Sequence, residues 1–526
     1  MEKEPKKRKV IFKPYSQENL QLPPLEQLIP ANHLVRIVNK VLDELDLCDE
    51  LEARYKGGGT SAYNPLMLLK VLVYGYCVKV YTSRKLEQGV NQDIMFMWLS
   101  GLQKPDHRTI NNFRKEMKDS IDEIFSEVLQ YLLKEKYLKL ENMFVDGSKF
   151  AADANKYSHV WAKNTERYKQ QTQQNIKQLL QEIEFINDNE PEPKPWTAEE
   201  VIQEIKKVRE EVLKIDDKKV KKKLIKTEKT LLKETEKLIK YENQEELLAG
   251  RNSYSKTDTD ATFMRMKDDT LLPAYNVMLS TENQFVVNYS IHQSASDSNL
   301  FVEHMNKFKT ISDKKPGNAV ADAAFGSEQN YAYLERFEIG NYLKFSTFHQ
   351  EQTKKFQENI FHKDNFSYDK TTDSFKCPDN RILGHKGSDF QKNKNGTVSY
   401  VRIYQSDNCD NCLLAEKCKK GKLRSIQVNR RLERYKQQAR ENLTSEKGIK
   451  LRKLRNIEVE TVFGNIKWNY GFRRFLLRGI EKVNIEMGLL SLAHNFRKLY
   501  NLALKGIALI HFWLNYYNKL KLLIIC

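Results

Sequence analysis

The sequence predicts a mixed α/β core that follows a helical domain and is interrupted by two insertions. Three observations support this fold class. Apolar residues recur at helical spacing from about residue 24 to 139, and short apolar runs then follow in the order strand, strand, strand, helix, strand, helix, strand. Between residues 201 and 250, 25 of 50 residues are Lys, Arg, Asp or Glu. A chain of 526 residues has room for roughly three or four compact units.

The charge of the chain favours a polyanionic partner. Lys and Arg number 88 and Asp and Glu 70, which gives a net charge of +18. Such a balance is typical of proteins that bind double-stranded DNA, although ribosome-associated and membrane-surface proteins can be equally basic. The basic N-terminal arm, residues 1–23, lacks the apolar run of a secretory signal. The apolar tail, residues 508–526, carries polar and basic residues and favours an amphipathic helix over a membrane span. We therefore expect a cytoplasmic protein with no membrane partner.

The helical domain, residues 24–139, contains a candidate DNA-reading helix. In PDHRTINNFRKEM, Asp106 can cap a helix on which Ile110, Phe113 and Met117 form a buried stripe. Arg and Asn side chains can pair with guanine and adenine edges, so the opposite face suits a recognition helix of the helix-turn-helix kind. A solvated polar face is the alternative. The predicted DNA-facing residues are Arg108, Asn111, Arg114 and Lys115, beside His107.

The core is expected to be a mixed five-stranded sheet flanked by helices, in three parts: residues 140–160, 251–346 and 431–526. Its first strand, 142–150, contains Asp146 followed by a Gly turn, and its fourth strand ends at Asp322. The other strands are predicted at 274–280, 284–292 and 341–346, with helices at about 297–312 and after Ser327. Residues 161–250 form the charged helical insertion, an antiparallel hairpin or a coiled coil.

Two carboxylates at the ends of buried strands require an explanation, because an unpaired buried carboxylate costs several kcal/mol. Metal binding supplies one. A third carboxylate, Glu460, shares a helical face with Phe463, Gly464 and Lys467 through spacings of three, four and seven. Two Asp and one Glu offer hard oxygen ligands for two Mg²⁺ or Mn²⁺ ions, which could activate a water or a 3′-hydroxyl at a phosphodiester. Each acid taken alone could equally be solvated or salt-bridged.

Four separated segments resemble the insertion-sequence transposases of the DDE type. FVDGSKFAADANKYSHVWAK is similar to the segment around the first aspartate of that family, VADAAFGSEQNY to the segment around the second, and RNIEVETVFGNIKWNYGFRRFLLRG to the segment around the glutamate. IFKPYSQENL, LIPANHLVR and PDHRTINNFR are similar to its helical DNA-binding domain. The matches occur in the family's order and extend over most of the chain.

The resemblance implies a ribonuclease-H-like catalytic fold in which Asp146 and Asp322 hold the metal ions and Glu460 completes one coordination shell. Lys467 would contact the phosphate of the transposon end. Related enzymes often carry Tyr and Arg at fixed positions ahead of the Glu, but this chain has Lys453 and Asn456 there, with Arg452 and Arg455 one residue away. Glu458 is the near competitor of Glu460, although its spacing to Lys467 places it on another helical face.

The second insertion, residues 347–430, carries four of the seven cysteines. Cys409, Cys412 and Cys418 form C-x2-C-x5-C, and Cys377 lies 32 residues before the first of them. Four thiolates could close a tetrahedral structural Zn²⁺ site, with reduced thiols in a basic loop as the alternative. RIYQSDNCDNCLLAEKCKKGKLR resembles the Cys-bearing segment between the second Asp and the Glu of those transposases.

Aromatic and basic residues alternate just after the Glu460 helix. We expect Phe472 and Phe475 to pack in the core and Arg473, Arg474 and Arg478 to face DNA. The sequence therefore predicts a bacterial, nucleoid-associated DNA transposase, a homodimer on DNA that cleaves and rejoins strands. The alternatives are an inactive DNA-binding derivative and a host nuclease of the same fold.

Overall fold

The computed structural model describes residues 24–45, 47, 51, 62–187, 195–392, 396–419 and 421–524, with side chains described to residue 183 before the first internal loop and to residue 506 at the C-terminal end. The basic arm predicted at residues 1–23 lies outside the described residues. So do all side chains of the apolar tail predicted at residues 508–526, for which the structure gives only a helical path to residue 524. No helix in the described part of the chain combines the length and the apolar character needed to cross a bilayer.

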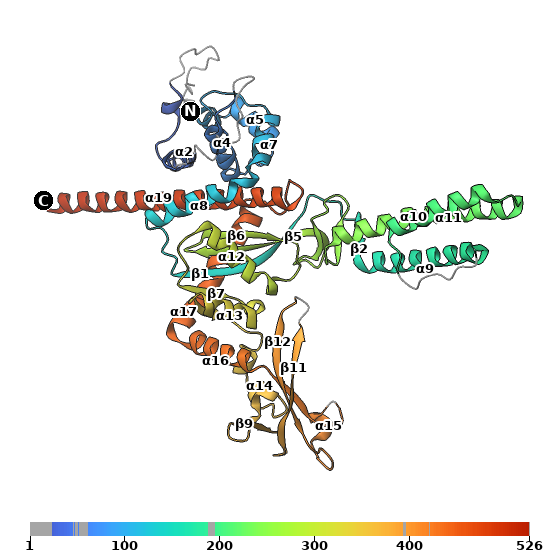
Figure 1. Ribbon diagram of the computed structural model, residues 1–526. Helices are drawn as coiled ribbons and strands as arrows, with labels where there is room; N and C mark the ends of the chain where they lie inside the picture. The colour runs from blue at the N-terminus through green and yellow to red at the C-terminus, as the bar shows by residue number, and fades with distance from the viewer. Residues whose placement is uncertain are drawn as a thin grey trace, which may run out of the picture.

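The N-terminal region is helical, as predicted, and sits above the rest of the molecule in Figure 1. The Asn64 side chain caps the most buried of its helices, α4, by accepting a hydrogen bond from the Met67 N–H. The Asp106 side chain caps α7 in the same way, by accepting from the Thr109 N–H at 2.7 Å. The helices are α1 (Leu25–Leu28), α2 (Leu34–Glu44), α4 (Pro65–Cys77), α5 (Ser83–Gln92), α6 (Ile94–Leu99), α7 (His107–Glu116), η1 (Met117–Asp119) and α8 (Ile121–Lys134).

The core is a mixed sheet with the order β6-β5-β1-β7-β8, in which β1, β7 and β8 are parallel and β5 runs antiparallel to both of its neighbours, β1 and β6. The strands are β1 (Asn142–Ala151), β5 (Leu271–Glu282), β6 (Phe285–His292), β7 (Asn318–Ala321) and β8 (Gly340–Leu343). A sixth strand, β4 (Thr262–Arg265), pairs with the first residues of β5, so the expectation of five strands is corrected. β5 is long enough to pair with β4 and β6 one after the other.

Helices cover both faces of this sheet and tie it to the N-terminal region. α12 (Phe301–Ile311), after η2 (Asp297–Asn299), packs on β6, and α13 (Glu328–Arg336), after η3 (Ala323–Phe325), packs on β8. The helix predicted to begin at Ser327 is α13, and the Ser327 side chain caps it by accepting from the Asn330 N–H. The long α19 (Ile480–Ile524) contacts β6, α4 and α8, and Figure 1 shows it lying between the N-terminal helices and the sheet. One continuous apolar core therefore joins the two regions.

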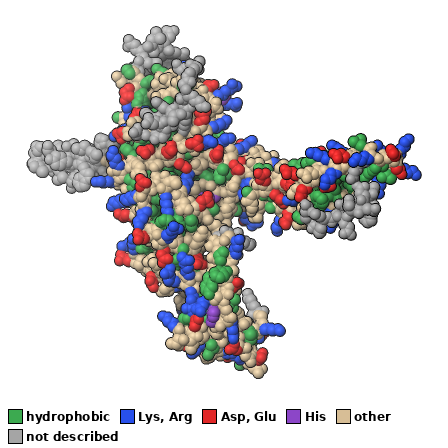
Figure 2. Space-filling model, in the orientation of Figure 1, with side chains coloured by type: hydrophobic (Ala, Val, Ile, Leu, Met, Phe, Trp, Pro, Cys, Tyr) green, Lys and Arg blue, Asp and Glu red, His purple; other side chains and the backbone are tan. Residues whose placement is uncertain are grey.

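The charged insertion is an arm of three helices that projects to the right in Figure 1. α9 (Ala162–Asn187) and α10 (Ala198–Lys214) both pack against α11 (Lys218–Leu248) around an apolar core of their own. The short strands β2 (His159–Trp161) and β3 (Ser253–Ser255) pair at its base. Basic and acidic side chains are interspersed along the arm (Figure 2).

The Cys-bearing insertion has an antiparallel sheet of its own, which the sequence did not predict. Its order is β13-β12-β11-β10-β9, and Phe366, Leu383, Tyr404 and Ile426 form a small core beneath it. The strands are β9 (Ser367–Asp369), β10 (Ser374–Lys376), β11 (Ile382–Lys392), β12 (Val398–Ser406) and β13 (Ser425–Val428); the helices are η4 (Gln350–Gln352), α14 (Lys354–Gln357), η5 (Lys363–Asn365) and α15 (Ala415–Cys418).

A broken helical run leads from this insertion back to the core sheet. α16 (Arg430–Thr444) packs on β8 and α17 (Glu446–Arg455) packs on β7. The backbone stays helical through three further segments. These are a π-turn η6 (Asn456–Glu460), α18 (Thr461–Gly464) and a second π-turn η7 (Asn465–Asn469). π-turns are rare and occur frequently at functional sites.

Candidate active site

The first two predicted acids lie side by side where the parallel pairing of β1 and β7 ends. Val145 and Ala321 are register partners, and Asp146 and Asp322 are the next residue of each strand. The sequence suggested that Asp146 lies at the end of its strand. In the structure β1 continues past it, because β5 pairs with β1 as far as Ala151. Asp146 therefore sits within a strand, and its Oδ1 accepts the Gly147 N–H at 2.9 Å. Asp322 caps η3, accepting the Ala324 N–H at 3.1 Å.

The third acid reaches the same place from the broken helical run. Arg455 Nη2 lies 3.4 Å from Asp146 Oδ2 and 3.2 Å from Asp322 Oδ2, while its Nη1 lies 3.2 Å from Glu460 Oε1. These four side chains are called the carboxylate cluster below. The Arg455 side chain is only 6% exposed, whereas those of Asp322 and Glu460 are 45% and 53% exposed. One buried cation thus holds three carboxylates, and two of these remain open to solvent.

The π-turn explains how Arg455 comes to face Glu460. The two residues are five apart, which is the spacing between successive turns of a π-helix, whereas an α-helix stacks residues three or four apart. The family spacing would place an arginine at position 456, which is Asn456 in this chain. The extra residue in η6 brings Arg455 into contact with Glu460 instead. The departure from the family spacing noted in the sequence is compensated by the local winding of the helix.

Glu458 points away from the carboxylate cluster. Its carboxylate is buried and accepts the backbone N–H of Gln284, at the turn between β5 and β6, at 2.6 Å. Burial raises the pKa of Glu458, although the Gln284 N–H opposes the shift. Of the two neighbouring glutamates, Glu460 is the one that the structure brings to Asp146 and Asp322.

A fourth carboxylate, Asp297, approaches the site and was not singled out from the sequence. It lines the same cavity as Asp146 and Glu460, and the Asn276 amide donates to its Oδ1. A Cβ atom on Gly147 would lie only 2.8 Å from the Asp297 carboxylate. Asp297 was assigned only to the start of a helix, because nothing in the local sequence shows that the loop after β6 folds over β1.

Burial shifts the pKa values of Asp146 and Lys467 in opposite directions. Burial raises the pKa of Asp146 to about 6, against the lowering effect of Arg455 and the Gly147 N–H. Burial lowers the pKa of Lys467 to about 8, with a further contribution from Lys267. Lys467 Nζ donates to Ser148 Oγ and to the Lys149 carbonyl, both at 2.6 Å, and so is anchored to β1.

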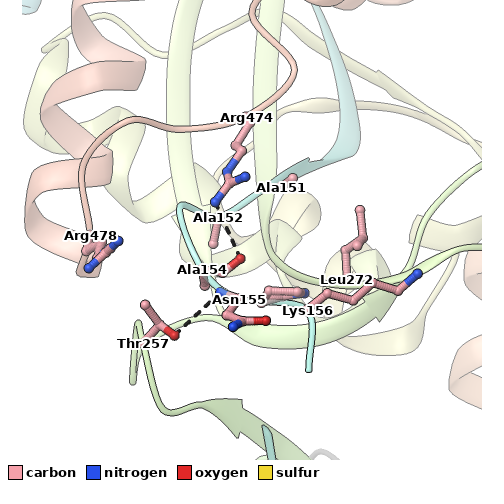
Figure 3. A pocket seen from close by; sticks show the side chains of 10 residues that line it. Ala151, Ala152, Ala154, Asn155, Lys156, Thr257, Leu272, Arg474 and Arg478 are labelled. Atoms are coloured by element: carbon pink, nitrogen blue, oxygen red, sulfur yellow. Dashed lines mark hydrogen bonds between the residues drawn. The ribbon is translucent and has the colours of Figure 1, made fainter. Parts of the chain in front are cut away.

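A cavity of about 850 Å³ opens beside these residues. Glu460, Phe463, Gly464 and Lys467 all line it, which agrees with the single helical face predicted from their spacing. It shares Ala151, Leu272 and Arg474 with a second cavity of about 470 Å³. Figure 3 shows this cavity, with Arg474 reaching toward the Ala154 carbonyl and Arg478 to one side. The two cavities therefore adjoin, and together, from Asp146 to Arg478, they are called the groove below.

The segment after the second π-turn forms one wall of this groove. Phe472 and Phe475 are buried, as expected, and the Phe475 N–H donates to the Ala151 carbonyl at 2.9 Å. Arg473, Arg474 and Arg478 are exposed, also as expected. Arg474 and Arg478 share the Asp153 carboxylate, each at 2.9 Å, so part of their charge is balanced within the protein.

The predicted recognition helix needs one correction. Ile110, Phe113 and Met117 are buried and Arg108 and Lys115 are exposed, with Asn111 half-buried. Arg114, however, is buried rather than on the exposed face: it donates to the Tyr81 carbonyl and to Asn111 Oδ1, both at 2.8 Å. It also lies within 3.4 Å of the Tyr76 hydroxyl. Arg114 therefore joins α7 to its neighbouring helices, and the prediction that it faces DNA is wrong.

The four cysteines of the insertion converge although they are far apart in sequence. Cys377, Cys409, Cys412 and Cys418, called the cysteine cluster below, line one small enclosed space, and none forms a disulfide. Burial would raise the pKa of Cys409, but the Ser406 hydroxyl and the Arg424 N–H donate to its Sγ and the net shift is downward. With the side chains placed as they are, no three His, Cys, Asp or Glu in the described part of the chain surround a shared metal position.

Comparison with known families matches two parts of the chain. A family described as transposase DDE domain matches residues 376–500, which include the cysteine cluster, Glu460 and Lys467. A family described as transposase domain (DUF772) matches residues 23–116 of the helical region. Asp146 and Asp322 lie outside both matches. No curated protein and no solved structure matches the chain.

Proposed function

Since its two family matches identify the chain as an insertion-sequence transposase of the DDE type, we propose that it cleaves DNA at its element's ends and transfers the freed 3′-hydroxyl to target DNA. Asp146, Asp322 and Glu460 are the proposed catalytic residues. One observation carries the proposal: three acids from β1, the end of β7 and the broken helical run meet on one guanidinium. The mixed sheet is compatible with a ribonuclease-H-like core.

The donor set suits Mg²⁺ or Mn²⁺, which favour carboxylate oxygens. Arg455 faces three carboxylates, and Asp297 adds a fourth nearby, so four acidic side chains gather at this end of the cavity. Divalent ions bound there supply a Lewis acid that activates a water or a 3′-hydroxyl and stabilises the leaving oxygen. Because Arg455 lies between the three acids, its guanidinium has to move aside when they become ligands.

The chain's own residues would orient the DNA. Lys467 is held by β1 at the cavity wall, and its desolvated ammonium gains stability from an approaching phosphate. The groove that continues to Arg474 and Arg478 gives the strand a basic path away from the carboxylates. Both arginines would exchange part of their pairing with Asp153 for DNA phosphates.

The helical N-terminal region is the proposed DNA-binding domain. Arg114 is buried, but Arg108 and Lys115 are exposed on α7 and Asn111 is half-buried, so these three side chains are the proposed contacts to a DNA groove. We also propose a homodimer on DNA, since two transposon ends have to be brought together for joining.

A structural Zn²⁺ site is proposed at the cysteine cluster. The four thiols line one small enclosed space, and four thiolates could close a tetrahedral site there if their side chains turned toward a shared position. Such a site would fix the loop between β12 and β13 to the end of β10.

The proposal is tested with DNA that carries the inverted repeats flanking the reading frame. With Mg²⁺ or Mn²⁺, we expect strand cleavage at the repeats and joining of a pre-cleaved 3′-end to a plasmid. Asp322→Ala should abolish both while the mobility shift of repeat DNA is retained. Binding without cleavage by the unmodified chain would favour an inactive derivative, and cleavage without joining would favour a host nuclease.

A further inference from the structure

Trp468 has an unusual position for a tryptophan. It follows Lys467 in the second π-turn and is 69% exposed, and among the described side chains it is the only exposed tryptophan. It lines the same cavity as Asp146 and Glu460. Tryptophan combines a large apolar ring with an N–H donor and is enriched at binding interfaces, so its place at the wall of this cavity suits contact with a ligand.

A cation already lies over the face of the Trp468 ring. The Arg473 guanidinium is centred 3.7 Å from the ring centroid, and its Nε is 3.4 Å from the Lys467 carbonyl. A guanidinium stacked on an indole presents two flat surfaces, of which one is charged. The pair is fixed at both ends, because Lys467 is anchored to β1 and the backbone carbonyl of Arg473 accepts a hydrogen bond from the Ala151 N–H.

The cavity around the pair suits a nucleic-acid strand. Lys149, Arg265, Lys267 and Arg474 line it and offer positive charge to a phosphate backbone. Aromatic rings beside such cations are the usual platform for unpaired bases, which stack on them with little regard to sequence. In a paired duplex, by contrast, the faces of the bases are covered by their neighbours.

On these grounds we propose that Trp468 and Arg473 form a stacking platform for an unpaired nucleobase of the DNA strand held at the carboxylate cluster. The inference rests on the proposed function and specifies which form of DNA the site prefers: a strand locally freed from its duplex next to the phosphate that reacts. Trp468 is a substrate-positioning residue and takes no part in proton or phosphoryl transfer.

The test compares two DNA probes on the full-length protein in Ca²⁺. One is a blunt 20-bp duplex and the other is the same duplex with a four-nucleotide 3′ overhang that contains one 2-aminopurine. We expect Trp468→Ala to weaken binding of the overhang probe by roughly 5- to 100-fold and that of the blunt duplex by less than about twofold. The wild type should quench 2-aminopurine fluorescence on binding, and Trp468→Ala should not.

Three further variants distinguish stacking from a general effect. Trp468→Phe should retain most of the quenching, and Arg473→Lys should lose part of it while the salt dependence of binding is kept. Leu213→Ala removes an equally exposed apolar side chain on the helical arm and should change neither probe. An abasic site in place of the 2-aminopurine should weaken wild-type binding by the same factor as Trp468→Ala, with no further loss in the variant.

Equal weakening of both probes by Trp468→Ala, or additive effects of the variant and the abasic site, would overturn the stacking proposal. Failure of the proposed function looks different: the wild type would neither cleave nor join repeat DNA, whatever the result with 2-aminopurine. If the wild type cleaves and Asp322→Ala does not, while Trp468→Ala binds both probes normally, only the stacking platform is rejected.

Discussion

The carboxylate cluster and the cysteine cluster both bring together residues from distant parts of the chain, yet they differ in how they meet solvent. The carboxylates open onto a large cavity, and two of the three are about half exposed. The thiols of Cys377, Cys409 and Cys418 are buried around a small enclosed space. A reacting site needs room for substrate, whereas a structural site needs all its ligands satisfied by the protein. The difference is consistent with the proposed chemistry at the carboxylate cluster and the proposed structural role of the cysteine cluster.

The sharpest test of the open site uses two glutamates of the same π-turn. Glu460→Gln should lower strand cleavage by about a thousandfold or more, since it removes a ligand from metal ions worth several kcal/mol in the transition state. Glu458→Gln should leave cleavage within a fewfold of wild type, because Glu458 bonds to the Gln284 N–H instead of the cluster. Cleavage rates on repeat DNA decide the matter, and equal losses in the two variants would refute the assignment of Glu460.

The closed site should respond in a different way. Cys409→Ser is expected to lower zinc affinity by about a hundredfold or more, because the thiolate is replaced by a much poorer ligand. Metal analysis of the purified protein and limited proteolysis of residues 347–430 measure the effect. Mn²⁺ binding at the carboxylate cluster should survive. A variant that retains stoichiometric zinc, or a wild type that contains none, would contradict the closed-site proposal.

The open site should also depend on pH. The pKa of Asp146 is raised to about 6 by burial, so below pH 6 a proton competes with metal for this carboxylate. Apparent Mn²⁺ affinity should therefore fall by about tenfold for each pH unit below 6 and level off above it. Calorimetric titrations between pH 5 and 8 provide the measurement. Asp146→Asn should bind weakly and lose this dependence; an unchanged pH profile would show that Asp146 is not a ligand.

The smallest effect concerns the close approach of Asp297 to β1. Gly147→Ala places a methyl group 2.8 Å from the Asp297 carboxylate and should destabilise the protein by about 1–3 kcal/mol through overpacking. Gly464→Ala is the matched control, because it lines the same cavity but has open space around its Cβ. Urea denaturation would compare them. Equal midpoints would mean that Asp297 moves away without cost.

The sequence was sufficient where local pattern decides the structure. The order of the core strands along the chain, the cap at Asp106, the helix start at Ser327 and the shared face of Glu460 and Lys467 follow from periodicity and from residue type, and the structure agrees with them. The acids that converge were identified through their surroundings in sequence, since no local rule states that residues 146, 322 and 460 meet.

The features that the sequence did not predict depend on packing between distant segments. Arg114 carries the charge expected of a DNA contact, but the groups that bury it, the Tyr81 carbonyl and Tyr76, belong to other parts of the fold. Asp297 is brought to the site by a loop that crosses β1. The sheet of the Cys-bearing insertion contains two long strands, β11 and β12, but few of their residues are buried, so they lack the clear apolar alternation of a core strand.

The π-turn at η6 has a consequence for how such chains are recognised. One additional residue between an arginine and a glutamate is absorbed by a wider helical turn, so the two side chains keep their mutual placement while the distance between them in sequence grows from four to five. A search that demands a fixed number of intervening residues would pass over this chain. Removing Ile457 should restore regular winding, bring the arginine to the shorter spacing, and leave the geometry of the acids largely intact.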